Sequence, residues 1–179
     1  DLRMSRGLGD VYKRQGMSLE NDLNDSNAYY CSCDRALIHK KPTPIQVVKV
    51  DYPERSAAKI TEAYYKTPST TDYNGIYRGR AIDFEAKETR QKTSFPFKSI
   101  HPHQIEHLKK VIQHGGIGFF IIRFTCFEET YLIDAAILID MYYEGERKSI
   151  SYMKVKEVGS LIRICLLYTS DAADDTPCV

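Results

Sequence analysis

The sequence predicts a single α/β domain, in which helices flank a mixed central β-sheet and a stalk projects from the body. Three observations predict this class. Apolar residues recur at helical spacing in segments 18–30 and 101–114. A β-branched apolar run, 117–124, has the length of a buried strand. Polar and apolar residues alternate over segment 72–87, as they do in a hairpin with one buried face.

The N-terminal half contains a helix, a short extended segment and the stalk. The helix covers residues 18–30, and its first residue, a serine, is the predicted N-cap. Segment 35–41 is a short strand or a turn that ends in basic residues. Segment 45–51 is β-branched and predicts a strand, whereas segment 57–66 fits a helix or a strand. Region 42–68 offers few large apolar residues to a core. A projecting stalk would explain this, and so would an ordinary surface excursion.

The C-terminal half alternates helices and strands. Segment 88–99 predicts a basic, polar loop. A helix over residues 101–114 follows, with a proline in its first turn and a Gly-Gly pair at its end. Beyond the buried strand already described, segment 130–133 predicts another strand, and an aspartate caps a helix from 135 to about 142. Segment 147–164 is basic and then apolar, and it predicts no particular element.

The predicted hairpin is the most informative part of the chain. If its turn is Arg78-Gly79, Asp72 lies directly opposite Glu85, with Cβ atoms about 5 Å apart. Strand alternation then places Asp83, Glu85 and Lys87 on one face of the sheet. Opposed carboxylates are destabilising unless a cation lies between them. Two carboxylates and an ammonium group on one face are suited to holding a divalent cation and activating water against a phosphodiester.

Two alternatives to this interpretation remain open. Asn74-Gly75 is a stronger turn by propensity, but it would pair Asp72 with Tyr77 and leave Glu85 without a partner. We prefer the Arg78-Gly79 turn because it gives both strands a useful length. The carboxylates could also belong to a solvated polar face with cross-strand ion pairs, because this short pattern arises by chance in any charged chain.

The two ends of the chain look foreign. Residues 1–15 and 165–179 resemble translated sequencing-adaptor sequence, so the predicted nuclease domain is 16–164, with its stalk at about 42–68. The net charge of +1 argues neither for nor against nucleic acid. No apolar run is long enough to span a bilayer. Three cysteines lie between the two ends, and we expect them to be free thiols in a reducing cytoplasm.

Between residues 16 and 164 the sequence resembles the RecU family of Holliday junction resolvases. These are bacterial recombination nucleases with the fold of type II restriction endonucleases. Five segments carry the resemblance: Gly16-Met-Ser-Leu-Glu20, Lys40-Lys-Pro-Thr-Pro-Ile-Gln46, Pro68-Ser-Thr-Thr-Asp-Tyr-Asn-Gly75, Ile82-Asp-Phe-Glu-Ala-Lys-Glu-Thr89 and His103-Gln-Ile-Glu-His107. The resemblance therefore implies a restriction-endonuclease-like core.

The resemblance also implies a magnesium site and a set of partners. Its metal-site positions correspond to Thr70, Asp72, Glu85 and Gln104, and Lys87 corresponds to the residue that stabilises the transition state. One Mg²⁺ per subunit is implied, and Mn²⁺ can replace it. The implied substrate is four-way junction DNA, and because a junction has two-fold symmetry we expect a homodimer to supply two symmetric sites. Contact with the RecA recombinase is implied by the family alone. A bacterial, cytoplasmic location is implied with these partners.

In the family, the stalk enters the centre of the junction. Basic side chains at its root and along it would meet phosphates, namely Lys40, Lys41, Arg55, Lys59 and Lys66. Tyr64 and Tyr65 would stack on unpaired bases. The loop that carries Arg90 and Lys92 is a second candidate phosphate surface. The alternative is a solvated hairpin with scattered lysines.

Two other functions, and a different metal, compete with this prediction. A duplex endonuclease of the same fold is one, because fold does not fix substrate. A non-catalytic junction-binding protein that regulates the recombinase is the second. His101, His103 and His107 raise the possibility of a zinc site, but they lack the His-Glu-x-x-His pattern and a nearby thiol.

Overall fold

The computed structural model describes residues 18–53, 57–66, 68–145 and 148–163. The predicted foreign ends lie outside the described residues. The centre of the body is a six-stranded sheet in the order β1-β4-β5-β7-β8-β10. Its strands are β1 (Leu37–Lys40), β4 (Tyr73–Tyr77), β5 (Arg80–Thr89), β7 (Ile117–Phe124), β8 (Glu129–Asp134) and β10 (Ser160–Ile162). Only β5 and β7 run parallel among these pairs, so the predicted mixed sheet is confirmed.

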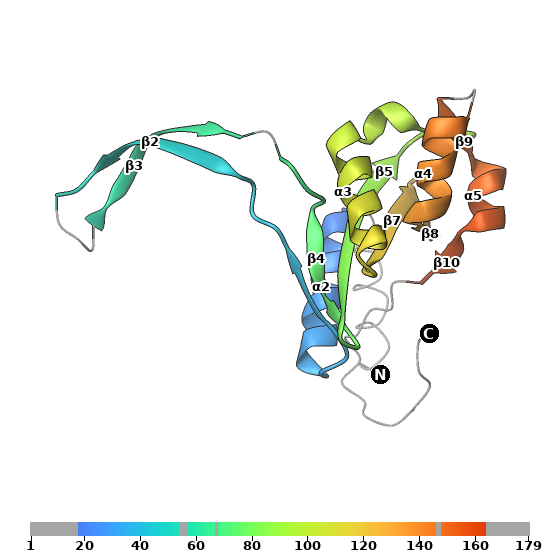
Figure 1. Cartoon of the computed structure of the whole chain (residues 1–179), viewed down its shortest axis with the longest axis horizontal. Helices are drawn as coiled ribbons and strands as arrows, with labels where there is room; N and C mark the ends of the chain where they lie inside the picture. Colours follow the sequence, from blue (N-terminus) through green and yellow to red (C-terminus); the bar gives the residue numbers. More distant parts are fainter. Residues whose placement is uncertain (1–17, 54–56, 67, 146–147, 164–179) are drawn as a thin grey trace, which may run out of the picture.

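Helices cover both faces of the sheet (Figure 1). Helix α2 (Leu19–Ser32) packs on one face, where Leu19 and Leu23 join a buried cluster with Phe84. Helices α3 (Pro102–Gln113) and α4 (Ala135–Glu144) pack on the other face, together with α5 (Tyr152–Val158). The larger core cluster lies on this second side. The predicted α/β class with flanking helices is therefore confirmed.

The predicted helix ends follow from their caps. The Ser18 side chain accepts a hydrogen bond from the Asn21 amide at 3.3 Å at the start of α2. Asp134 accepts from the Ala136 amide at 2.8 Å at the start of α4. Pro102 occupies the first turn of α3, where no intrahelical donor is needed. These short-range signals placed the helix starts correctly.

The stalk is a two-stranded sheet that extends away from the body (Figure 1). It consists of β2 (Ile45–Asp51) and β3 (Lys59–Tyr65), which pair antiparallel with an irregular register between Val47 and Val50. Nearly all of its side chains are exposed. The ambiguous segment 57–66 is therefore a strand, because its apolar residues find no core to form a helix face against.

One segment differs from its prediction, and another contains elements that the sequence did not predict. The predicted loop 88–99 contains the end of β5, strand β6 (Ser94–Pro96) and the 3₁₀ helix η2 (Phe97–Ser99). Phe95 and Phe97 are buried in the core, and this aromatic burial outweighs the polar character of the flanking residues. Segment 147–164 contains β9 (Ser149–Ser151), α5 and β10, which are too short for their periodicity to be read from the sequence. Within the described residues, no helix has both the length and the apolar character needed to cross a membrane.

Candidate active site

The hairpin of β4 and β5 has the register that the sequence predicts. Tyr77 pairs with Arg80 across the turn, and Arg78 and Gly79 both have positive φ angles, 48° and 76°. Two left-handed residues form the tight turn that matches the twist of a hairpin. Tyr73 pairs with Phe84, so the next step along the ladder places Asp72 opposite Glu85.

The alternative turn at Asn74-Gly75 is wrong, because both residues lie within β4 and pair with β5. Gly75 has a separate role at the junction with β1. A Cβ atom there would lie 2.0 Å from the main-chain oxygen of Leu37, closer than any packing allows. The glycine of this dipeptide therefore serves the close approach of two strands and not a turn.

Glu85 is a fully buried carboxylate beside a cation. Its side chain is 0% exposed, and Lys87 Nζ lies 2.7 Å from Oε1. The other oxygen, Oε2, accepts a hydrogen bond from the Asp72 amide at 3.1 Å. Oε1 itself receives no hydrogen bond of good geometry, despite the nearby ammonium. The structure thus brings together the three predicted catalytic residues and leaves one buried oxygen able to accept a further positive partner.

Burial and neighbouring charges act in opposite directions on Glu85. Burial raises the pKa of Glu85, the Lys87 ammonium lowers it, and the charge of Asp72 raises it; the net shift is upward. The pKa of His103 is lowered overall. Burial and the charges of His101 and Lys87 lower it, whereas the charge of Asp72 raises it. Helix α3, which carries His103, packs against β5 and so lies beside Glu85.

The two further predicted metal-site residues, Thr70 and Gln104, have neutral oxygen atoms that can bind a metal ion. Gln104 is 4% exposed on α3, which packs against β5. Its Oε1 accepts a hydrogen bond from the His101 amide at 2.9 Å, which caps the helix. Thr70 is half-buried, and its hydroxyl donates to the main-chain oxygen of Thr71 at 3.3 Å. The amide oxygen of Gln104 has a second lone pair and can serve a ligand as well as the cap.

This donor set fits a hard divalent cation. All four predicted ligands present oxygen atoms, and one buried carboxylate oxygen lacks a hydrogen bond. In the described part of the chain, no three His, Cys, Asp or Glu side chains gather as a metal site. A site with two carboxylates and two neutral oxygens would leave positions for water and phosphate, as Mg²⁺ prefers.

Next to this site lies an acidic residue with several partners. Asp83 Oδ1 lies 2.6 Å from Lys41 Nζ, and it accepts a hydrogen bond from Thr71 Oγ1 at 2.8 Å. His107 Nε2 lies 3.0 Å from the same oxygen. Burial alone would raise the pKa of Asp83, but the hydrogen bonds from Lys41, His107 and Thr71 hold it below its usual value. Strand alternation identified the face of Asp83, but no local signal identified its partners.

The basic residues predicted at the root of the stalk have partners within the protein. Lys40 forms an ion pair with Glu20, and Lys41 forms one with Asp83. Their role as phosphate contacts therefore competes with these interactions. Arg55 lies outside the described residues.

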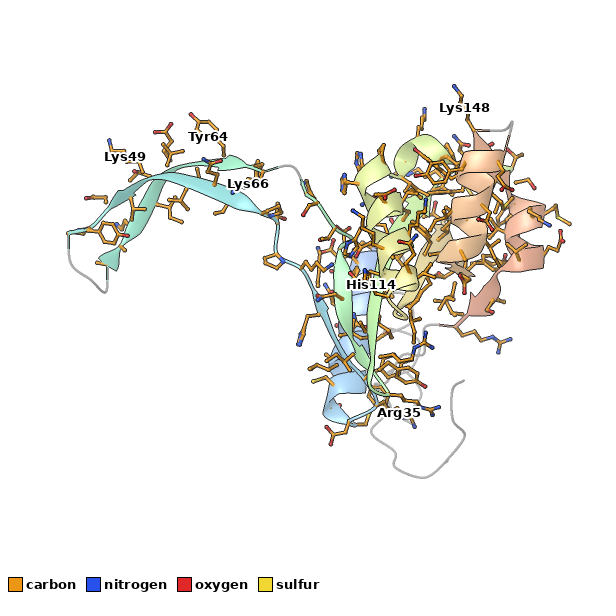
Figure 2. All side chains as sticks on the ribbon, in the orientation of Figure 1. Arg35, Lys49, Tyr64, Lys66, His114 and Lys148 are labelled. Atoms are coloured by element: carbon orange, nitrogen blue, oxygen red, sulfur yellow. The ribbon has the colours of Figure 1, made fainter. Side chains whose placement is uncertain are left out.

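The remaining predicted DNA contacts are exposed. Tyr64 and Tyr65 are 61% and 84% exposed, and as neighbours in a strand they point to opposite faces of the stalk. Figure 2 shows Tyr64 and Lys66 on the stalk, away from the body. Four basic side chains are exposed in the stalk and in the loop after β5, namely Lys59, Lys66, Arg90 and Lys92. Their contact with DNA stays a prediction.

Comparison with known proteins identifies close relatives. The family described as "RecU: Recombination protein U" matches residues 14–170. A protein of Bacillus mycoides (strain KBAB4), named Holliday junction resolvase RecU, is 58% identical over 155 residues, covering 85% of this chain and 78% of the relative. Proteins of the same name from Bacillus cereus (strain B4264) and Bacillus anthracis (strain CDC 684 / NRRL 3495) are 57% and 58% identical with the same coverage.

Solved structures resemble this one as well. One of them is the resolvase Hjc of Archaeoglobus fulgidus, with a TM-score of 0.45, 9% identity, and coverage of 78% of this chain and 93% of that chain. The family match spans most of the chain, and the relatives share more than half of their aligned residues with it. The chain therefore belongs to the RecU family of recombination proteins.

Proposed function

We propose that this protein is a Mg²⁺-dependent, structure-selective endonuclease that resolves Holliday junctions by paired symmetric nicks during homologous recombination and DNA repair. One observation carries the proposal. The buried Glu85 contacts both Lys87 and the main-chain amide of Asp72, in a chain that is 58% identical to a protein named Holliday junction resolvase RecU.

The chemistry follows from the residues of the site. Asp72 and Glu85 would hold Mg²⁺ with the oxygens of Thr70 and Gln104, and Mn²⁺ could take its place. When bound, the ion supplies positive charge to the phosphate and lowers the pKa of the attacking water. Lys87 is held beside the site by Glu85, where its ammonium would stabilise negative charge that develops on the phosphate oxygens.

The substrate and the assembly belong to the same proposal. A four-way junction has two-fold symmetry, so two symmetric cuts need two sites related by the same axis, which a homodimer provides. The exposed tyrosines of the stalk would stack on unpaired bases at the crossover, while lysines along it meet phosphates. Contact with the RecA recombinase and a bacterial cytoplasmic location are the other parts of the proposal.

A cleavage assay with Asp72→Asn tests this function. The wild-type protein, incubated with a labelled synthetic four-way junction, should give paired nicks with 5′-phosphate ends only when Mg²⁺ is present. Asp72→Asn should bind the junction as the wild type does and cleave at least about a hundredfold more slowly, because it loses a metal-binding charge. Asp140→Asn, which neutralises an exposed carboxylate on α4, is the matched control.

Two outcomes would contradict the proposal in different ways. Junction binding without any Mg²⁺-dependent product would favour a non-catalytic protein that regulates the recombinase. Equal cleavage of a linear duplex would favour a duplex endonuclease of the same fold. Full activity of Asp72→Asn would remove Asp72 from the site.

A further inference from the structure

We propose that Asp83 is a positioning residue of the nuclease site, which ties both ends of the stalk and helix α3 to the strand that carries Glu85. This inference rests on the proposed function, because it assigns a role to a group beside the proposed site. Asp83 lies two positions before Glu85 and on the same face of β5.

Three separate parts of the chain meet at one oxygen of Asp83. Lys41, at the point where the stalk leaves β1, places Nζ 2.6 Å from Oδ1. Thr71, where the stalk returns to the body, donates its hydroxyl at 2.8 Å. His107, on α3, places Nε2 at 3.0 Å. Lys41 also donates to the Thr71 hydroxyl at 3.3 Å. The two segments that flank the stalk therefore contact each other as well as Asp83.

This cluster determines where Asp72 lies. Its main-chain oxygen accepts from the Lys41 amide at 2.7 Å, and its main-chain amide donates to Glu85 at 3.1 Å. The residue before it, Thr71, is buried and is held by Asp83. Asp72 itself is exposed, so these contacts, and not packing of its own side chain, fix its position.

The same cluster holds the other side of the site. His107 lies one turn after Gln104 on α3, and residues three apart share a helix face. The contact of His107 with Asp83 on β5 therefore fixes the position of the helix that carries Gln104. Removing Asp83 would release both the Asp72 segment and the Gln104 helix from their common strand.

The burial of the cluster makes it more than a surface ion pair. The side chains of Lys41, Asp83 and His107 are 23%, 13% and 24% exposed. Exposed ion pairs contribute little, whereas loss of one partner of a largely buried pair leaves an uncompensated charge. A displacement of about 1 Å at reacting groups can cost about a hundredfold in rate. We therefore expect removal of the Asp83 carboxylate to slow the catalytic step.

The test compares Asp83→Ala with Asp22→Ala. Asp22 is a matched control because its ion pair with Arg123 is also 2.6 Å long, and both side chains are 14% exposed. It lies on α2, which covers the opposite face of the sheet. For Asp83→Ala, the single-turnover rate of junction cleavage should fall about tenfold to a hundredfold, while the Kd for the junction changes less than about twofold. Asp22→Ala should leave this rate unchanged at a temperature well below its Tm.

Two additional measurements separate positioning from general stability. The ¹⁵N–¹H signal of Asp72 in metal-free protein should shift in Asp83→Ala and stay in place in Asp22→Ala, because its hydrogen bond to Glu85 is disturbed only in the first variant. Asp83→Asn keeps an acceptor oxygen and should recover part of the rate. If Asp83→Ala does not fold, Thr71→Val removes only the hydroxyl from the cluster and should still slow cleavage about tenfold.

The results that would overturn this inference are distinct from those that would overturn the proposed function. Wild-type cleavage by Asp83→Ala or by a folded Thr71→Val would refute the positioning role, as would an equal loss of rate in Asp22→Ala. Those results would leave the loss of cleavage in Asp72→Asn intact. Wild-type cleavage by Asp72→Asn would instead refute the proposed site.

Discussion

Glu85 shows how a single side chain is balanced between opposing interactions. It is fully buried, which disfavours its charge, while Lys87 at 2.7 Å favours it. The net effect is a raised pKa. A group whose pKa is raised in the folded state stabilises the fold below its unfolded pKa, and this contribution is lost as the pH rises through the folded pKa. The buried carboxylate therefore makes the metal-free protein less stable as the pH rises from the ordinary pKa of a glutamate to the raised pKa of Glu85.

Lys87→Met should make the stability of the metal-free protein depend more strongly on pH. Without the ammonium, the pKa of Glu85 should rise further, which a ¹³C NMR titration of the Glu85 carboxyl in metal-free protein would measure. The free energy of unfolding in urea should fall more at about pH 8 than at about pH 4. At the higher pH the unfolded chain is ionised, so folding must either bury an unpaired charge or take up a proton. Lys154→Met, which removes an exposed lysine paired with Glu157, should show no such pH dependence. A pKa that stays constant or falls in Lys87→Met would refute this account.

At the scale of elements, the stalk contrasts with the body. In the part of the chain that the structure describes, no helix covers its two strands, β2 and β3, and their apolar side chains Ile45, Val47 and Ile60 are exposed. A two-stranded sheet by itself is at most marginally stable in water. The stalk therefore adds little to the stability of the body.

Replacement of residues 45–65 by a short Gly-Ser linker should leave the body folded. The two ends are already adjacent, because the Lys66 amide donates to the main-chain oxygen of Pro44 at 3.0 Å. We expect the Tm to change by less than about 2 °C. Affinity for a four-way junction should fall to that for a linear duplex, measured by gel shift with both DNAs. A variant that unfolds, or one that keeps its junction preference, would contradict this view of the stalk.

At the scale of the whole molecule, one core joins segments that lie far apart in the sequence. The larger cluster contains Phe95, which is 0% exposed, together with residues of β7, β8, α3, α4 and α5. Strand β6, which carries Phe95, has only three residues and pairs with β9. Side-chain packing in this cluster therefore adds to the two strand pairings, β9 with β6 and β10 with β8, that attach the C-terminal elements to the body.

Phe95→Ala should therefore destabilise the entire body. Truncation of a fully buried phenylalanine costs about 3–5 kcal/mol. Urea unfolding followed by circular dichroism would measure this loss. Phe127→Ala removes a phenylalanine that is 40% exposed and should cost much less. Equal losses in the two variants would show that Phe95 is not part of the central core.

Short-range patterns in the sequence determined much of this protein. Turn propensity alone favoured Asn74-Gly75, but the useful length of the two strands favoured the turn at Arg78-Gly79. Strand alternation then gave the register of the hairpin, which the structure confirms from Tyr73 to Arg80. Helix caps such as Ser18 and Asp134 likewise marked where helices begin. These features depend on backbone geometry over a few residues, which composition and spacing reveal.

Only the tertiary structure decided which distant groups meet. Nothing near Lys41 in the sequence shows that its ammonium is held by Asp83 instead of facing solvent. The complete burial of Glu85 and Phe95 depends on the elements that pack over them. Spacing along the chain sets the direction of a side chain, but its partners and its distance from water depend on how sheets and helices are stacked in space.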